Sequence, residues 1–145
     1  MELCQHVECM KKRKQWTQRV KNVEYWEQEL RRLHANEYRI KWSAHVEQRE
    51  SERNVRSWQS QEIFENGSCI SFAIYNDTQF GQTYEWIWFW YLKVGRGLYR
   101  PIHMVLKMNP GVPVQKIVVS TIYDPSIKPW MWDENYSTRI CWKEK

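Results

Sequence analysis

The sequence predicts an α+β fold in which N-terminal helices pack on a twisted antiparallel sheet of about four strands. An amphipathic, highly charged stretch comes first, and runs rich in strand-forming residues follow Gly67. Helices followed by hairpin-connected strands are typical of α+β domains. The 145 residues contain no linker rich in Gly, Ser or Pro, so we expect one domain. In this domain, we expect residues 1–36 to form an N-terminal helix outside the core, and residues 37–145 to form the α+β core.

The first part of the chain is expected to be helical. Residues 10–35 predict one long amphipathic helix, because apolar side chains recur at three- and four-residue steps. This apolar stripe includes Trp16, Val20, Val23, Leu30 and Leu33. Residues 37–42 are expected to run extended, as a link or a short strand. Ser43 can cap a second helix, and a third, short helix is predicted from about residue 57 to Asn66-Gly67.

The rest of the chain reads as strands separated by turns. The predicted strands are residues 69–75, 84–94, 99–108 and 115–124. Glycine-containing turns at 95–97 and 109–111 separate the later ones. The tail is expected to end in a short helix or strand around residues 133–142.

The second predicted strand is unusually aromatic. Alternation puts Tyr84, Trp86, Trp88 and Trp90 on one face, and Ile87, Phe89 and Tyr91 on the other. An exposed row could stack unpaired bases. The alternative is that helices cover both faces, and the apolar stripe of the N-terminal helix favours it because that stripe needs a surface to pack on.

Composition and charge narrow the class of protein. Ten tryptophans and 15% aromatic residues exclude a disordered chain. The net charge of +5 favours an anionic partner, of which RNA or DNA is the most common. The longest apolar run, residues 86–92, is too short to span a membrane, and no signal peptide is visible. We therefore expect a cytoplasmic protein. Glycine motifs of nucleotide cofactors are absent, so no cofactor is expected.

The four cysteines, Cys4, Cys9, Cys69 and Cys141, do not resemble a disulfide framework. Cys4 and Cys9, with His6 between them, could hold zinc, but no second ligand pair follows in the sequence. We therefore expect free cysteines, no metal, and a fold that survives a chelator.

His45, Arg49 and Arg53 are spaced four residues apart, which places them on one face of a helix. Taken alone, this spacing favours a solvated charged face, because most charge runs on helices are only solvated. The alternative is a positive strip with a titratable imidazole at one end.

Residues 40–140 carry several motifs in an order that resembles the barnase, EndoU, colicin and RelE-like ribonuclease toxins. The matching residues are His45, Arg49, Arg53, Asn54-Val55, Asn66-Gly67, Arg100-Pro101-Ile102-His103, Thr121-Ile122-Tyr123-Asp124-Pro125 and Trp130. The family usually has glycine where this chain has Asn54. The resemblance implies a metal-independent endoribonuclease with RNA as substrate, and an antitoxin or immunity protein as a possible partner.

The resemblance also implies roles for individual residues. His45 and His103 would supply the acid and base, while Arg49 would clamp the phosphate. Thr121 and Tyr123 complete the catalytic set, and alternation puts both on the same strand face as Val119. The remaining candidates for RNA binding are Arg53, Arg100 and Lys107. Two alternatives remain open: His103 as an ordinary core histidine, and the whole chain as a catalytically silent RNA- or protein-binding domain of the same fold.

Overall fold

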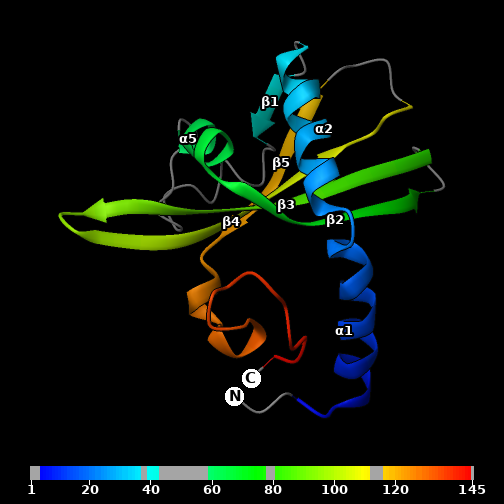
Figure 1. The fold of residues 1–145 in the computed structure, drawn as a ribbon, viewed down its shortest axis with the longest axis vertical. Helices are drawn as coiled ribbons and strands as arrows, with labels where there is room; N and C mark the ends of the chain where they lie inside the picture. The colour runs from blue at the N-terminus through cyan, green and yellow to red at the C-terminus, as the bar shows by residue number, and fades with distance from the viewer. Residues whose placement is uncertain (1–3, 37–38, 43–58, 78–80, 112–115, 145) are drawn as a thin grey trace.

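The computed structural model describes residues 4–36, 39–42, 59–77, 81–111 and 116–144 (Figure 1). The helices in these ranges are α1 (Val7–Val20), α2 (Val23–Ala35) and α5 (Gln59–Asn66). The strands are β1 (Arg39–Trp42), β2 (Ser68–Asp77), β3 (Gly81–Gly95), β4 (Leu98–Met108) and β5 (Lys116–Tyr123). Two short 3₁₀ turns follow, η1 (Pro125–Ile127) and η2 (Pro129–Met131). The predicted α+β class is confirmed.

The strands form one sheet in the order β1-β5-β4-β3-β2. The four predicted strands correspond to β2–β5, and each pairs antiparallel with its sequence neighbour. The prediction of a purely antiparallel sheet is wrong, because β1 adds a fifth strand parallel to β5. Ile40 and Trp42 of β1 pack against the main core, which explains why this short segment joins the sheet instead of serving as a link.

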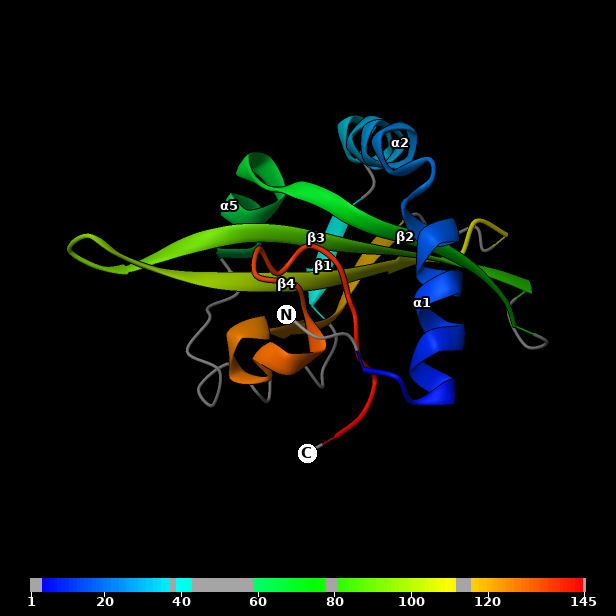
Figure 2. The ribbon, with the colours of Figure 1, turned by 60° about the horizontal axis from the view of Figure 1, so that its bottom comes forward.

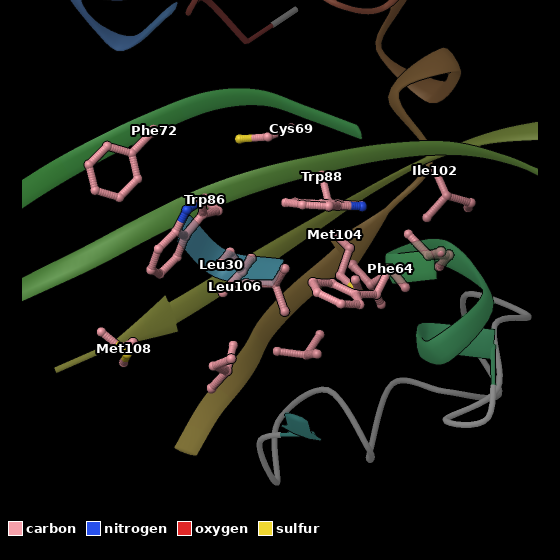
Figure 3. Packing of buried hydrophobic residues seen from close by; sticks show 14 of the residues in the cluster. Leu30, Phe64, Cys69, Phe72, Trp86, Trp88, Ile102, Met104, Leu106 and Met108 are labelled. Carbon is pink, nitrogen blue, oxygen red and sulfur yellow. The ribbon is translucent and has the colours of Figure 1, made fainter. Parts of the chain in front are cut away.

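The sheet is covered on both faces. Figure 2 shows α2 and α5 on one side, and α1 with the segment after β5 on the other. Figure 3 shows the larger core, in which Leu30 of α2 and Phe64 of α5 meet the side chains of β3 and β4. The layered arrangement leaves the ends of β4 and β5 next to the C-terminal segment, where the candidate site lies.

The predicted long N-terminal helix is two helices, which is a correction. α1 ends at Val20 and α2 begins at Val23, with a turn between them. Trp16 packs with Ile87 and Val105 on one face of the sheet, whereas Leu30 belongs to the core on the opposite face. The apolar stripe therefore serves two faces, and the chain must bend at the edge of the sheet to reach both.

The predicted alternation on β3 is confirmed. Trp86 and Trp88 are fully buried in the larger core, and Phe64 stacks on Trp88 with ring centroids 5.1 Å apart. These tryptophans are structural, because their rings are covered by helices and are not available to stack on bases. On the opposite row, Tyr91 remains 42% exposed.

A bulge on β5 corrects the predicted strand faces. Val105 pairs with Thr121 but the next residue, Leu106, pairs with Val119, so Ser120 is an extra residue. Val119 consequently lies in the core beneath α2 and α5, and it does not share a face with Thr121 and Tyr123. The Ser120 hydroxyl donates a hydrogen bond to the carbonyl of Val105 (3.4 Å).

Helix α5 ends at Asn66-Gly67 as predicted. A Cβ atom at Gly67 would overlap the carbonyl oxygens of Phe89 and Ile63, so only glycine fits between α5 and β3. The predicted helix from Ser43 to Asn54 lies outside the described residues. The tail contains a bridge between Trp132 and Arg139 instead of a short helix or a regular strand. Among the described helices, none is both long and apolar enough to cross a membrane.

Candidate functional site

His103 lies in the middle of β4 and is fully buried. Its Nε2 atom is 2.6 Å from the carbonyl oxygen of Tyr136, and its Nδ1 atom is 3.2 Å from the hydroxyl of Tyr123. Because a carbonyl oxygen can only accept, Nε2 must carry the proton of the neutral ring. Nδ1 then accepts a hydrogen bond from the Tyr123 hydroxyl, so both ring nitrogens of His103 are satisfied.

A tight turn in the C-terminal segment supplies the carbonyl that holds His103. Tyr136 has a φ of 56°, which is uncommon for a residue other than glycine. The Asp133 carboxylate accepts hydrogen bonds from the backbone N–H groups of Ser137 (2.9 Å) and Thr138 (3.3 Å). These bonds hold the turn closed and aim the Tyr136 carbonyl at the imidazole.

Burial determines the protonation states of this pair. Desolvation lowers the pKa of His103 to about 4, despite the hydrogen bond to the Tyr136 carbonyl. Desolvation also raises the pKa of Tyr123 to about 12. At neutral pH the imidazole is therefore uncharged, and the tyrosine keeps the proton that it donates to His103.

A cavity of about 540 Å³ lies where the ends of β4 and β5 meet the C-terminal segment. It is lined by Arg100, Thr121, Tyr123, Asp124, Pro125, Ile127, Lys128, Met131, Trp132, Arg139 and Glu144. Tyr123 belongs to this lining and contacts His103, so it connects the buried imidazole to the cavity.

Two of the cationic side chains around the cavity are paired with carboxylates. Arg100 Nε lies 2.7 Å from Asp124, whose other carboxylate oxygen caps η1 through the backbone N–H of Ser126. Lys128 Nζ lies 2.7 Å from Glu144, with both side chains largely exposed. Exposed pairs of this kind contribute little to stability, so an incoming anion can displace Glu144 at small cost.

Arg139 is the cation with the most unusual surroundings. Its guanidinium lies 5.1 Å from the ring centroid of Trp142 and 5.8 Å from that of Trp132. Its Nε donates to the carbonyl of Cys141 (3.1 Å), and desolvation lowers the pKa of the guanidinium. Among the ion pairs of the described residues, none joins Arg139 to a carboxylate. Glu144 acts on this charge from outside ion-pair distance. A partly buried cation with no ion pair in the described part of the chain is suited to bind a phosphate.

The structure brings together some of the predicted site residues. Arg100, Thr121 and Tyr123 line the cavity, and His103 lies behind Tyr123. Lys107 does not join them, because it sits near the far end of β4 with its Nζ 3.7 Å from Glu85. The remaining predicted residues, His45, Arg49 and Arg53, lie outside the described part of the chain.

Three important residues of the cavity were not predicted as site residues. Lys128, Trp132 and Arg139 belong to the tail, where hydrophobic periodicity is too irregular to assign an element or a face. The only available signal was the mixture of basic and tryptophan residues in that tail. The described residues able to hold a metal ion form a different cluster, Cys4, Cys9 and Cys141, none of which lines the cavity.

The function of the cavity must be argued from its own geometry. No protein-family model, curated protein or solved structure matches this chain.

Proposed function

We propose that this protein is a metal-independent endoribonuclease of the toxin type, and that the cavity bordered by β4, β5 and the C-terminal segment binds the RNA phosphate. The observation that carries the proposal is Arg139, a partly buried guanidinium that lines the cavity and has no ion pair among the described residues. Binding a phosphodiester there would offset the cost of burying the cation.

The surroundings of Arg139 fit RNA better than a small anion. The buried ring of Trp132 packs beside the guanidinium, and Lys128 adds a second positive charge at the cavity. The hydroxyl of Thr121 lies on the same lining and can position a phosphate oxygen or a ribose. The hydroxyl of Tyr123 already donates to His103, so it can accept a hydrogen bond from the substrate. The net charge of +5 favours approach of a polyanion.

Cleavage requires a base for the 2′-hydroxyl proton, an acid for the leaving 5′-oxygen, and cations for the charged phosphorane. By the family resemblance, His45 is a proton-transfer residue and Arg49 helps to stabilise the charge. One imidazole can balance the reaction, because the proton that it takes from the 2′-hydroxyl can pass to the leaving 5′-oxygen. We assign His103 a positioning role, because it is buried and reaches the cavity through the hydroxyl of Tyr123. A neutral His103 that accepts from Tyr123 fixes the orientation of that hydroxyl.

The second candidate is a catalytically silent RNA-binding domain of the same fold. The burial of His103 favours this alternative, since an imidazole with both nitrogens occupied cannot reach a substrate directly. The two candidates share the same phosphate site and differ only in whether the bound RNA is cut.

Incubation of the purified protein with total RNA and with a labelled RNA oligonucleotide separates the two candidates. In magnesium-free buffer, the ribonuclease proposal predicts cleavage products with 2′,3′-cyclic phosphate ends, and loss of cleavage in a His45→Ala variant. RNA that is bound but not cut supports the silent binding domain. A wild-type protein that neither binds nor cuts RNA would contradict both.

A further inference from the structure

Three cysteine thiols converge in the structure although the sequence separates one of them from the others by more than a hundred residues. The Sγ atoms of Cys4, Cys9 and Cys141 all lie within 4.8 Å of one another. Cys9 and Cys141 are buried, while Cys4 is partly exposed. Cys9 belongs to the first turn of α1, and Cys141 follows the bridge in the C-terminal tail.

The spacing of these thiols matches a metal site. The Sγ atoms of Cys9 and Cys141 are 3.8 Å apart. A disulfide would require about 2.05 Å. Two thiolates held about 2.3 Å from one tetrahedral zinc ion lie about 3.8 Å apart, which is the distance found here. The third sulfur needs to move by at most about 1 Å to complete the same geometry.

Backbone groups around the cluster favour thiolates. The N–H of Trp142 points at Cys9 Sγ, and the N–H of Lys143 points at Cys141 Sγ, both at 3.4 Å. Metal binding requires deprotonated thiols, and N–H groups in these positions would stabilise the thiolates.

Arg13 connects the backbone segment that carries Cys4 to the segment that carries Cys141. Its guanidinium donates to the carbonyl of Ile140 (2.7 Å) and to the carbonyl of Cys4 (2.5 Å). Three thiolates and one divalent zinc ion carry a net charge of −1, and the positive charge of Arg13 lies on the backbone of two segments that carry the ligands. The arrangement of ligands and their support is therefore already present in the fold.

We propose that Cys4, Cys9 and Cys141 bind one Zn²⁺ ion, which fastens the C-terminal tail to the start of α1. Thiolates select soft or borderline ions such as zinc over Mg²⁺. Within the described part of the chain, the three cysteines are the members of this cluster, and the exposed His6 is not one of them. Cys141 is the ligand that the sequence did not indicate, and the proposal differs from the expectation of no metal because of it.

The zinc ion would have a structural role that is separate from RNA cleavage. The tail that it anchors carries Arg139 and Trp132, which line the cavity. The inference does not rest on the ribonuclease proposal, because metal content and unfolding are measured without RNA. Loss of zinc is expected to loosen the tail and to lower the unfolding temperature of the whole domain.

Zinc titration of the reduced, metal-free protein tests this inference. We expect native mass spectrometry to show one bound Zn²⁺ per chain, Mg²⁺ to leave the protein metal-free, and Tm to rise with zinc occupancy. Cobalt should give thiolate-to-metal charge-transfer absorption. Cys4→Ser, at the least buried ligand, should weaken zinc binding about tenfold or more while preserving the fold. Cys141→Ser should have the same effect.

Cys69→Ser is the matched control. Cys69 is a buried cysteine outside the cluster, and its thiol donates to the carbonyl of Ser71 (3.2 Å), so this variant should still bind one zinc ion. Three results would overturn the inference. They are a reduced wild-type protein that binds no zinc, unchanged zinc affinity in the Cys4 and Cys141 variants, and a native Cys9–Cys141 disulfide in a metal-free protein.

Discussion

The Nδ1 atom of His103 accepts a hydrogen bond from the hydroxyl of Tyr123 across 3.2 Å, between neighbouring strands β4 and β5. The two residues are register partners in the sheet, and their rings meet edge-on with centroids 5.2 Å apart. His103 is buried, whereas Tyr123 lines the cavity. This pair therefore links the stability of the sheet to the geometry of the proposed phosphate site.

The pH dependence of stability should report the buried state of His103. Its pKa is lowered from 6.5 to about 4, so the unfolded state binds more protons than the folded state between these values. The neutral imidazole of His103 contributes its full share to the free energy of unfolding above pH 6.5, and this share is lost as the pH falls toward 4. The lost contribution reaches at most about 3 kcal/mol. Urea unfolding at pH 7 and pH 5 measures the part of this contribution that is lost between those two values.

A His103→Gln variant should flatten this pH dependence, because glutamine does not titrate. His34→Gln provides a control on α2, which packs on the opposite face of the sheet. An unchanged pH slope in His103→Gln would show that the imidazole is not the group responsible.

Tyr123→Phe should destabilise the protein by about 1–2 kcal/mol, because it leaves the buried Nδ1 of His103 without a donor. Chemical denaturation at neutral pH measures this loss. Tyr91→Phe is the control, since Tyr91 is an exposed tyrosine on β3 of the same sheet. Equal stabilities for Tyr123→Phe and the wild-type protein would mean that the hydrogen bond contributes nothing to folding.

Gly67→Ala should destabilise the protein by about 2–3 kcal/mol, because the added methyl group meets backbone oxygens that cannot move independently. Thermal unfolding detects this change. Gly111→Ala should have little effect, since a Cβ atom there meets nothing within 4 Å. A stable Gly67→Ala protein would contradict the close approach of α5 and β3.

The salt dependence of RNA affinity should identify the phosphate contact. Replacing Arg139 with alanine should reduce the slope of log affinity against log salt concentration by about 0.7 for single-stranded RNA, the value of one lost phosphate contact. Lys107→Ala should leave the slope unchanged, because Lys107 pairs with Glu85 away from the cavity. Fluorescence anisotropy with a labelled oligonucleotide measures both slopes. A slope that responds to Lys107 but not to Arg139 would place the RNA elsewhere.

Local signals in the sequence were sufficient to predict most of the strands and the end of α5. Alternation, turn glycines and the Asn66-Gly67 stop predicted β2–β5 and the end of α5. The bend between α1 and α2 was not predictable, because an apolar stripe does not show that its halves pack on opposite faces of a sheet. The bulge at Ser120 was also missed, since strand alternation assumes a regular register.

The sites were harder to predict than the strands. Arg100, Thr121 and Tyr123 were identified because they lie in motifs, and the structure places them around one cavity. Arg139 was missed because it lies in the irregular tail, and Cys141 because it meets Cys9, which is 132 residues away in the sequence. A tail without regular periodicity gives no indication of what it packs against.

The most direct test of the central claim is the rate at which wild-type, Arg139→Ala and Lys116→Ala proteins cleave one labelled RNA in magnesium-free buffer. Lys116 begins β5, at the opposite end of that strand from Tyr123, so its variant removes an equal charge outside the cavity. With folding verified by circular dichroism, we expect cleavage by the wild-type and Lys116→Ala proteins and a loss of about 100-fold in Arg139→Ala. Equal rates in all three proteins, or no cleavage by the wild-type protein, would contradict the proposed ribonuclease site.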